Sequence, residues 1–261
     1  MSAEHNHQPT DAISIHEIYN LVKALPKMDP VALPESDAFG RTGEWLLWMA
    51  RAQGASPQAE RVRLAIYAGA HGCAANSAEE TRKRITPLTG SEDPVVRVLQ
   101  QVDADLRLYE LDLDTPTADY TKGPALELDA AAHAMAYGMM AVEPGLHLLA
   151  LAGIGEGGEE AHKALLAALP KSEDPLATLA QHGGVETCAM VGAILAARLA
   201  KVPVLLDGVA AEAAAAVLAR MSAEATLHCA SAKALEPDLT DKAGLAAALG
   251  LARLRALAQL V

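Results

Sequence analysis

The stretch LLALAGIGEGGEEAH at residues 148–162 decides the fold. Its apolar first half predicts a buried strand, its glycines predict a tight turn, and its end predicts the start of a helix. Units of this kind hold phosphates in α/β proteins, because main-chain amides at a helix N-terminus direct partial positive charge at an anion. Glu156, Glu159 and Glu160 stand at the same turn, where carboxylates satisfy the helix dipole and repel phosphate. The stretch therefore predicts a phosphate-site scaffold with altered chemistry.

Apolar strands alternate with helices along the rest of the chain. Strands are expected at residues 62–68, 106–111, 146–152, 202–206 and 225–229, and helices at 12–25, 40–53, 79–84, 94–102, 125–140, 159–169, 175–181, 184–201, 210–221 and 241–260. Asp174 is expected to cap the helix that begins at Pro175. This alternation predicts an α/β fold with a parallel sheet covered by helices on both faces.

Three segments are expected along the chain. Residues 1–10 predict a disordered tail, residues 11–57 an N-terminal helical segment, and residues 58–261 the α/β domain. Three prolines between residues 26 and 39 predict an extended connector inside the helical segment. The charged run at residues 79–84 predicts a solvated, salt-bridged helix face.

Composition excludes several functions. The net charge of -12 and the absence of a basic run argue against binding to nucleic acid or to an anionic membrane. No apolar run is long enough to span a bilayer, and the N-terminus lacks the features of a signal peptide, so a cytoplasmic protein is expected. Cys73, Cys188 and Cys229 show no CxxC spacing, which predicts core cysteines.

No metal or cofactor is predicted from the sequence. His5, His7 and His16 are the histidines that could suggest a metal site. The first two lie in the expected tail, and no carboxylate or cysteine completes a set of ligands.

Four further stretches carry a family resemblance: PESDAFGRTGEWLLWMARAQG (34–54), AIYAGAHGCAA (65–75), LRLYELDLDTPTADYTKGP (106–124) and DPLATLAQHGGVETCAMVGAILAARLAKVPVLLDG (174–208). Together with Gly153-Ile154-Gly155 they resemble motifs of the nicotinate-nucleotide:dimethylbenzimidazole phosphoribosyltransferase family. The resemblance implies a Rossmann-like α/β fold and a glycosyltransferase of cobalamin biosynthesis. In that family a benzimidazole nitrogen attacks the ribose C1′ of nicotinate mononucleotide, nicotinate leaves, and α-ribazole phosphate forms.

The resemblance also implies the partners of the chain. We expect a nucleotide or a benzimidazole-like base as ligand, with no nucleic acid and no membrane. We also expect a homodimer, because the family enzyme is one and the helix with Trp45 and Trp48 offers an apolar face.

Candidate substrate-binding residues follow the ends of the predicted strands, where parallel sheets bind ligands. They are Gly153, Gly155, Gly157, Gly158, His71, Ser77, Asp207, Gly208 and Ser231.

Each of these candidates also has a purely structural interpretation. The four glycines could form a tight strand-to-helix turn, and His71 could be hydrogen-bonded inside a turn. Ser77 could cap a helix, the Asp207-Gly208 pair could be an ordinary turn, and Ser231 could supply loop polarity.

The sequence departs from the family pattern at positions that carry the catalytic and phosphate-binding residues of the family. In an ungapped match the general-base glutamate of the family falls on Ala247, so no catalytic residue is predicted. The Asn-Thr-Thr of the phosphate loop becomes Glu156-Gly157-Gly158, and the segment before Asp174 is much shorter. A homologue with weakened or lost catalysis is therefore expected. The alternative is a non-catalytic protein that binds a nucleotide or heterocycle or pairs with another subunit.

One structural observation separates these two hypotheses. A carboxylate that enters the pocket from elsewhere in the chain, or from a dimer partner, would support an enzyme. A pocket filled by Leu151, Ala247 and Leu251 would exclude one.

Overall fold

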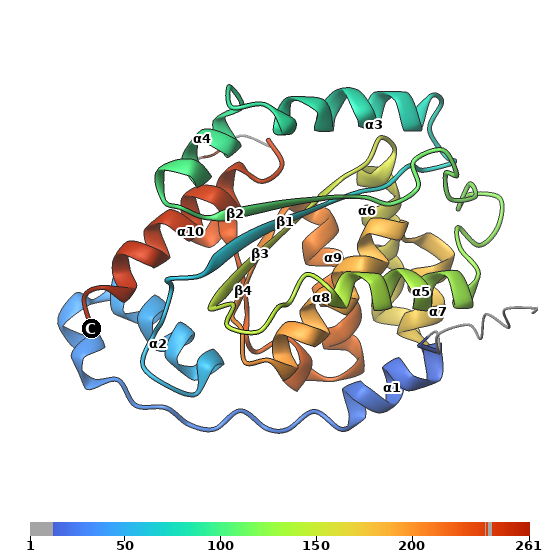
Figure 1. Ribbon diagram of the computed structural model, residues 1–261. Helices are drawn as coiled ribbons and strands as arrows, with labels where there is room; N and C mark the ends of the chain where they lie inside the picture. Colours follow the sequence, from blue (N-terminus) through green and yellow to red (C-terminus); the bar gives the residue numbers. More distant parts are fainter. Residues whose placement is uncertain (1–12, 238, 240–241) are drawn as a thin grey trace, which may run out of the picture.

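A computed structural model describes residues 13–237, 239 and 242–261 of the chain, so the expected tail at 1–10 lies outside the described residues. Five parallel strands form one sheet in the order β2-β1-β3-β4-β5 (Figure 1). The strands are β1 (Val62–Ala68), β2 (Asp105–Glu110), β3 (Leu148–Ile154), β4 (Val204–Asp207) and β5 (Cys229–Ser231). The α/β fold class with a parallel sheet is thereby confirmed.

Helices cover both faces of the sheet (Figure 1). One face carries α1 (Ile15–Lys23), α5 (Leu128–Met139), α6 (Gly158–Ala168), α7 (Pro175–His182), α8 (Val185–Leu199) and α9 (Gly208–Met221). The other carries α2 (Arg41–Gln53), α3 (Ser77–Ile85), α4 (Pro94–Gln101) and α10 (Leu245–Ala258). Among the described residues, no helix is both long and apolar enough to cross a membrane.

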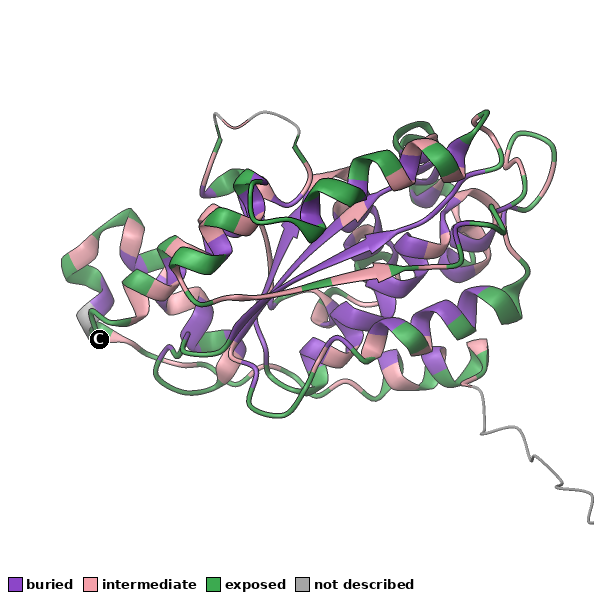
Figure 2. Ribbon diagram, turned by 45° about the horizontal axis from the view of Figure 1, so that its top comes forward, coloured by how far each residue is buried: buried purple, intermediate pink, exposed green. Residues whose placement is uncertain are grey.

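The side chains of each central strand contribute to two hydrophobic cores, one on each face of the sheet. On β1, Leu64 and Ile66 belong to the core under α10, whereas Ala65 and Tyr67 belong to the core under α8. Successive side chains of a strand point to opposite faces, so a strand covered on both faces is largely apolar. The buried Arg63 of β1 is compensated by ion pairs with Asp105 and Glu143. Figure 2 shows this burial along the central strands.

Helices α5 and α8 approach closely because each has a glycine that faces the main chain of the other helix. A Cβ atom built on Gly138 would lie 1.8 Å from the carbonyl oxygen of Ala189, and one on Gly192 would lie 1.8 Å from that of Met135. Only hydrogen fits at these two positions, so the small residues of α8 serve helix packing.

Two local predictions are wrong. The strand expected at 225–229 begins only at Cys229, because residues 223–225 form a 3₁₀ turn and the N–H of Cys229 bonds to the carbonyl of Thr226 at 2.9 Å. The connector is not extended throughout, since Pro34–Phe39 is a 3₁₀ helix. Proline has a backbone angle that suits the first position of a helix. The cap at Asp174 is confirmed, since its carboxylate accepts the N–H of Ala177 at 2.9 Å.

The strand order creates a switch point between β1 and β3. The chain after β1 continues into α3 on one face, and the chain after β3 continues into α6 on the other. Diverging connections of this kind open a crevice beyond the carboxyl ends of the two strands, and ligands of open α/β sheets bind there.

Candidate functional site

A cavity of about 400 Å³ lies at the carboxyl ends of β3 and β4. This volume falls within the range of about 300–1,000 Å³ that small-molecule sites occupy. Four predicted binding residues line it, namely Gly153, Gly155, Asp207 and Gly208. The structure therefore brings the ends of two strands together in one concave site.

The other predicted glycines, Gly157 and Gly158, are not among the residues that line the cavity. A Cβ atom on Gly157 would lie 2.7 Å from the Ala74 Cβ, and one on Gly158 would lie 3.0 Å from the His71 Nε2. Gly157 also has a φ of +84°, a backbone conformation that is strained for any residue with a side chain. These two glycines allow the turn before α6 to pack closely on the loop after β1.

Ser77 and Ser231 take structural positions. Ser77 is the first residue of α3 and not its cap. Its hydroxyl accepts the N–H of His71 at 2.7 Å and donates to the carbonyl of Glu156 at 2.8 Å, so it ties together the loops of the switch point. The hydroxyl of Ser231 donates to the Glu212 carboxylate at 3.1 Å.

Cationic side chains outnumber carboxylates among the residues that line the cavity. The cations are Arg84, Lys163 and Lys233, none of which the sequence pattern predicted as a binding residue, and the carboxylates are Glu159 and Asp207. The first turns of α6, α9 and α10 also contribute to its wall. Helix N-termini and cationic side chains both attract anions, and this wall of the cavity carries both.

Two of the three glutamates of the turn form ion pairs with these cations. The Nζ of Lys163 lies 2.5 Å from an oxygen of Glu159, and a guanidinium nitrogen of Arg84 lies 3.8 Å from an oxygen of Glu156. The expected repulsion of phosphate is therefore reduced by neighbours that the sequence did not place at the turn.

Asp207 brings a carboxylate into the cavity. Its Oδ2 accepts the N–H of Ala247 at 3.0 Å, and the main chain of Gly244 also bonds to this carboxylate. Burial raises the pKa of Asp207 above the usual 3.8, although both amides and the charge of Lys233 lower it. The result is an aspartate that is more basic than usual and is held at the start of α10.

The apolar filling that would exclude an enzyme is not seen. Leu151, Ala247 and Leu251 are fully buried and belong to the two cores, and none of them is among the residues that line the cavity. A carboxylate enters the cavity instead, from the end of β4.

His71 is buried beside the cavity rather than exposed in it. Its Nε2 lies 2.8 Å from the Oε1 of Glu186, a buried residue that the sequence did not single out. Burial opposes charge on both groups, but the attraction between them prevails, so that the pKa of His71 is raised and that of Glu186 is lowered.

Comparison with known proteins shows what this fold and cavity are similar to. A family model described as phosphoribosyltransferase matches residues 22–173 and 162–258. The nicotinate-nucleotide–dimethylbenzimidazole phosphoribosyltransferase of Rhizobium rhizogenes is 33% identical over 267 residues, which cover 80% of this chain and 77% of that protein. The chain belongs to the nicotinate-nucleotide–dimethylbenzimidazole phosphoribosyltransferase family. The corresponding proteins of Sinorhizobium medicae and Brucella anthropi are 33% and 31% identical.

Solved structures of this phosphoribosyltransferase family have the same fold. A crystal structure from Thermus thermophilus gives a TM-score of 0.74 at 22% identity and covers 94% of this chain and 95% of that one. A second structure from the same organism gives a TM-score of 0.73 at 23% identity. The two segments that match the family model overlap at residues 162–173, where sequence analysis found the chain shortened.

Proposed function

We propose that this chain binds nicotinate mononucleotide in the cavity and transfers its phosphoribosyl group to a benzimidazole-type base, at a reduced rate. The observation that carries the proposal is the Asp207 carboxylate. It lines the cavity and accepts the N–H of Ala247, the residue with which the ungapped motif match aligns the family's general base. The relatives' names supply the two substrate classes.

The anionic end of the nucleotide is assigned to the cationic wall. Arg84 and Lys163 flank the turn at Gly155, and the first turn of α6 is part of the same wall. A phosphate monoester there replaces ion pairs with Glu156 and Glu159, which are exposed and cost little to rearrange.

The transfer itself needs one proton acceptor. One ring nitrogen of the base attacks the ribose C1′ while the bond from C1′ to nicotinate breaks, and the other ring nitrogen loses its proton. We assign that proton to Asp207, whose raised pKa makes it a better acceptor than an ordinary aspartate. Its side chain is shorter than that of glutamate and is already bonded to α10, which accounts for the reduced rate.

A second candidate function is nucleotide or heterocycle binding without turnover. It is favoured by Ala247 itself, whose methyl group cannot accept a proton, and by hydrogen bonds that explain Asp207 as a cap for α10. The same site would then hold the ligands without transferring the ribosyl group.

The test compares wild type, Asp207→Asn and the matched control Asp129→Asn, which changes an exposed aspartate on α5. Nicotinate mononucleotide and dimethylbenzimidazole are titrated by calorimetry, and α-ribazole phosphate is measured by chromatography. Asparagine can still accept the N–H of Ala247, so the cap is kept while the base is lost. We expect a loss of about 10²–10⁴-fold in Asp207→Asn and none in the control.

Each other outcome has a definite meaning. Binding without product in wild type supports the second candidate. If turnover survives in Asp207→Asn, Asp207 is not the general base. If the wild-type protein binds neither compound, the proposal is contradicted.

We also propose that the protein is a cytoplasmic homodimer, as the family resemblance implies. In the structure Trp45 and Trp48 are only partly buried against the core, so the face of α2 keeps some apolar surface.

A further inference from the structure

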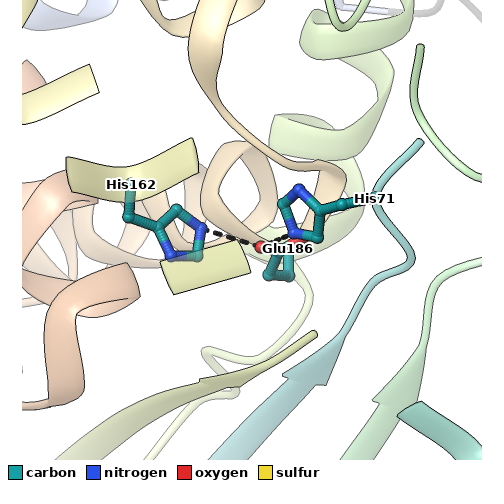
Figure 3. A group of neighbouring side chains, drawn as sticks. All are labelled: His71, His162 and Glu186. Atoms are coloured by element: carbon teal, nitrogen blue, oxygen red, sulfur yellow. Dashed lines mark hydrogen bonds and ion pairs between the residues drawn. The ribbon is translucent and has the colours of Figure 1, made fainter. Parts of the chain in front are cut away.

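Three buried side chains from distant parts of the sequence converge beside the cavity. His71 follows β1, His162 lies on α6, and Glu186 lies in the first turn of α8 (Figure 3). The Nε2 atoms of the two histidines lie 2.8 Å and 2.9 Å from the same carboxylate oxygen, Oε1 of Glu186. All three residues are at least 97% buried, since their exposed fractions are 1%, 3% and 1%.

The second oxygen of this carboxylate has no partner. The Oε2 of Glu186 is buried and accepts no hydrogen bond from the described residues. A buried polar atom without a partner carries a desolvation cost, so nearly all such atoms in proteins are bonded. A purely hydrogen-bonded cluster accounts for the contacts at Oε1 and leaves Oε2 unexplained.

The main chain around Glu186 keeps space free for this carboxylate. A Cβ atom on Gly69 would lie 2.2 Å from Oε2, and one on Gly184 would lie 2.3 Å from it. The same atom on Gly184 would lie 2.4 Å from the Cε1 of His71. Two glycines from different loops thus border the unpartnered oxygen and the imidazole next to it.

We propose that His71, His162 and Glu186 bind a divalent transition metal ion, with Zn²⁺ as the best match. Two imidazole nitrogens and one carboxylate oxygen are a donor set that Zn²⁺ takes in proteins, and borderline nitrogen donors disfavour Mg²⁺ and Ca²⁺. The donor atoms of the three residues all lie within 4.8 Å of one another.

The geometry needs only a small adjustment. Donors about 2.1 Å from a tetrahedral ion are about 3.4 Å apart, so each histidine nitrogen must move from the carboxylate oxygen by about 0.5 Å. Thr187 lies close by, with its hydroxyl oxygen 2.7 Å from the Nε2 of His162.

The site adjoins the proposed binding cavity without depending on it. Three protein donors leave one position of a tetrahedral ion for water or for an oxygen of a ligand. His162 also lines the cavity, so the metal site and the cavity share this residue. Metal binding can be measured whether or not the chain transfers a phosphoribosyl group.

The test measures binding of the metal alone to the full chain. Zn²⁺ is titrated by calorimetry against a competing chelator, and Co²⁺ is titrated with visible absorption as the readout. We expect one ion per chain. We also expect the visible absorption bands of Co²⁺ to be those of an ion with a low coordination number. The variants are His162→Asn and Glu186→Gln, because glutamine keeps a hydrogen-bonding oxygen but is a poor ligand.

Both variants are expected to weaken Zn²⁺ binding by more than about 100-fold. The control is His133→Asn, which changes an exposed histidine on α5 and is expected to leave the affinity unchanged. Circular dichroism shows which variants fold, and Zn²⁺ is expected to raise the melting temperature of wild type but not of Glu186→Gln.

The wild-type protein alone can overturn the proposal. If it binds no Zn²⁺ in a one-to-one ratio and gives no visible Co²⁺ band, the cluster is a hydrogen-bond network. Equal affinity in wild type and Glu186→Gln would assign the ion to other residues.

Discussion

Replacement of His228 is predicted to flatten the acid dependence of stability. The side chain is 1% exposed, and its Nε2 donates to the carbonyl of Ile194, 3.1 Å away. Burial lowers the pKa of His228 from 6.5 to about 3, and the charge of Arg198 acts in the same direction. Between these two values the unfolded chain takes up a proton that the folded chain does not, so stability is lost as the pH falls.

The magnitude follows from the width of this window. Each pH unit is worth about 1.4 kcal/mol, so the single histidine removes about 2 kcal/mol of unfolding free energy by about pH 5. His228→Gln keeps a donor for the carbonyl of Ile194 and does not titrate. From about pH 8 to about pH 5, wild type should therefore lose about 2 kcal/mol more than the variant.

Urea unfolding at a series of pH values measures this difference. His133→Gln is the matched control, because this histidine is exposed on α5, and it should follow the wild-type curve. If His228→Gln loses as much stability as wild type on acidification, then His228 is protonated in the folded state and its assigned burial is refuted.

Four other outcomes are expected. Lys163→Gln should weaken binding of nicotinate mononucleotide about 10-fold by calorimetry and spare the base, whereas Lys122→Gln should change neither; equal weakening in both would refute the anion site. Gly192→Ala should lower the free energy of unfolding by about 1–3 kcal/mol in urea, while Gly123→Ala, with no atom within 4 Å of the added Cβ, should change it little. Turnover should fall as the pH decreases through the pKa of Asp207, above 3.8, because only the carboxylate accepts a proton; a flat profile would exclude it as the base. Sedimentation equilibrium should give twice the chain mass of 27.2 kDa, and a concentration-independent monomer would refute the homodimer.

The central strands were predictable because they are short and almost entirely apolar. Within β1 the exception is Arg63, whose buried guanidinium pairs with Asp105 and Glu143. A run such as residues 62–68 is buried on both faces, as a parallel sheet covered by helices requires. The short strand β5 was misplaced because a 3₁₀ turn precedes it, and Ala225 in that turn is buried and as apolar as a strand residue.

Part of the candidate site was equally predictable. Gly153, Gly155, Asp207 and Gly208 follow strand ends, and parallel strands bring such ends to one edge of the sheet. This reasoning could place them together without any knowledge of the helices.

The charged wall and the histidine cluster were not predictable in this way. Arg84 ends a run that forms the expected salt-bridged face, with Lys83 bonded to Glu79 and Glu80, and only the direction of α3 turns it toward the cavity. Glu186 lies 115 residues from His71 along the chain, and its only local signal is a carboxylate within an apolar helix. Contacts between residues so far apart in the sequence depend on tertiary packing, which a local sequence pattern does not predict.

A crystal structure of Asp207→Asn with nicotinate mononucleotide and dimethylbenzimidazole would show directly where the two substrates bind. This variant should hold both substrates without turnover. We predict that the phosphate lies against Arg84 and Lys163, and that a ring nitrogen of the base lies within hydrogen-bond distance of the side chain at position 207. A nucleotide bound outside this cavity, or a base whose nitrogens face other groups, would contradict this prediction.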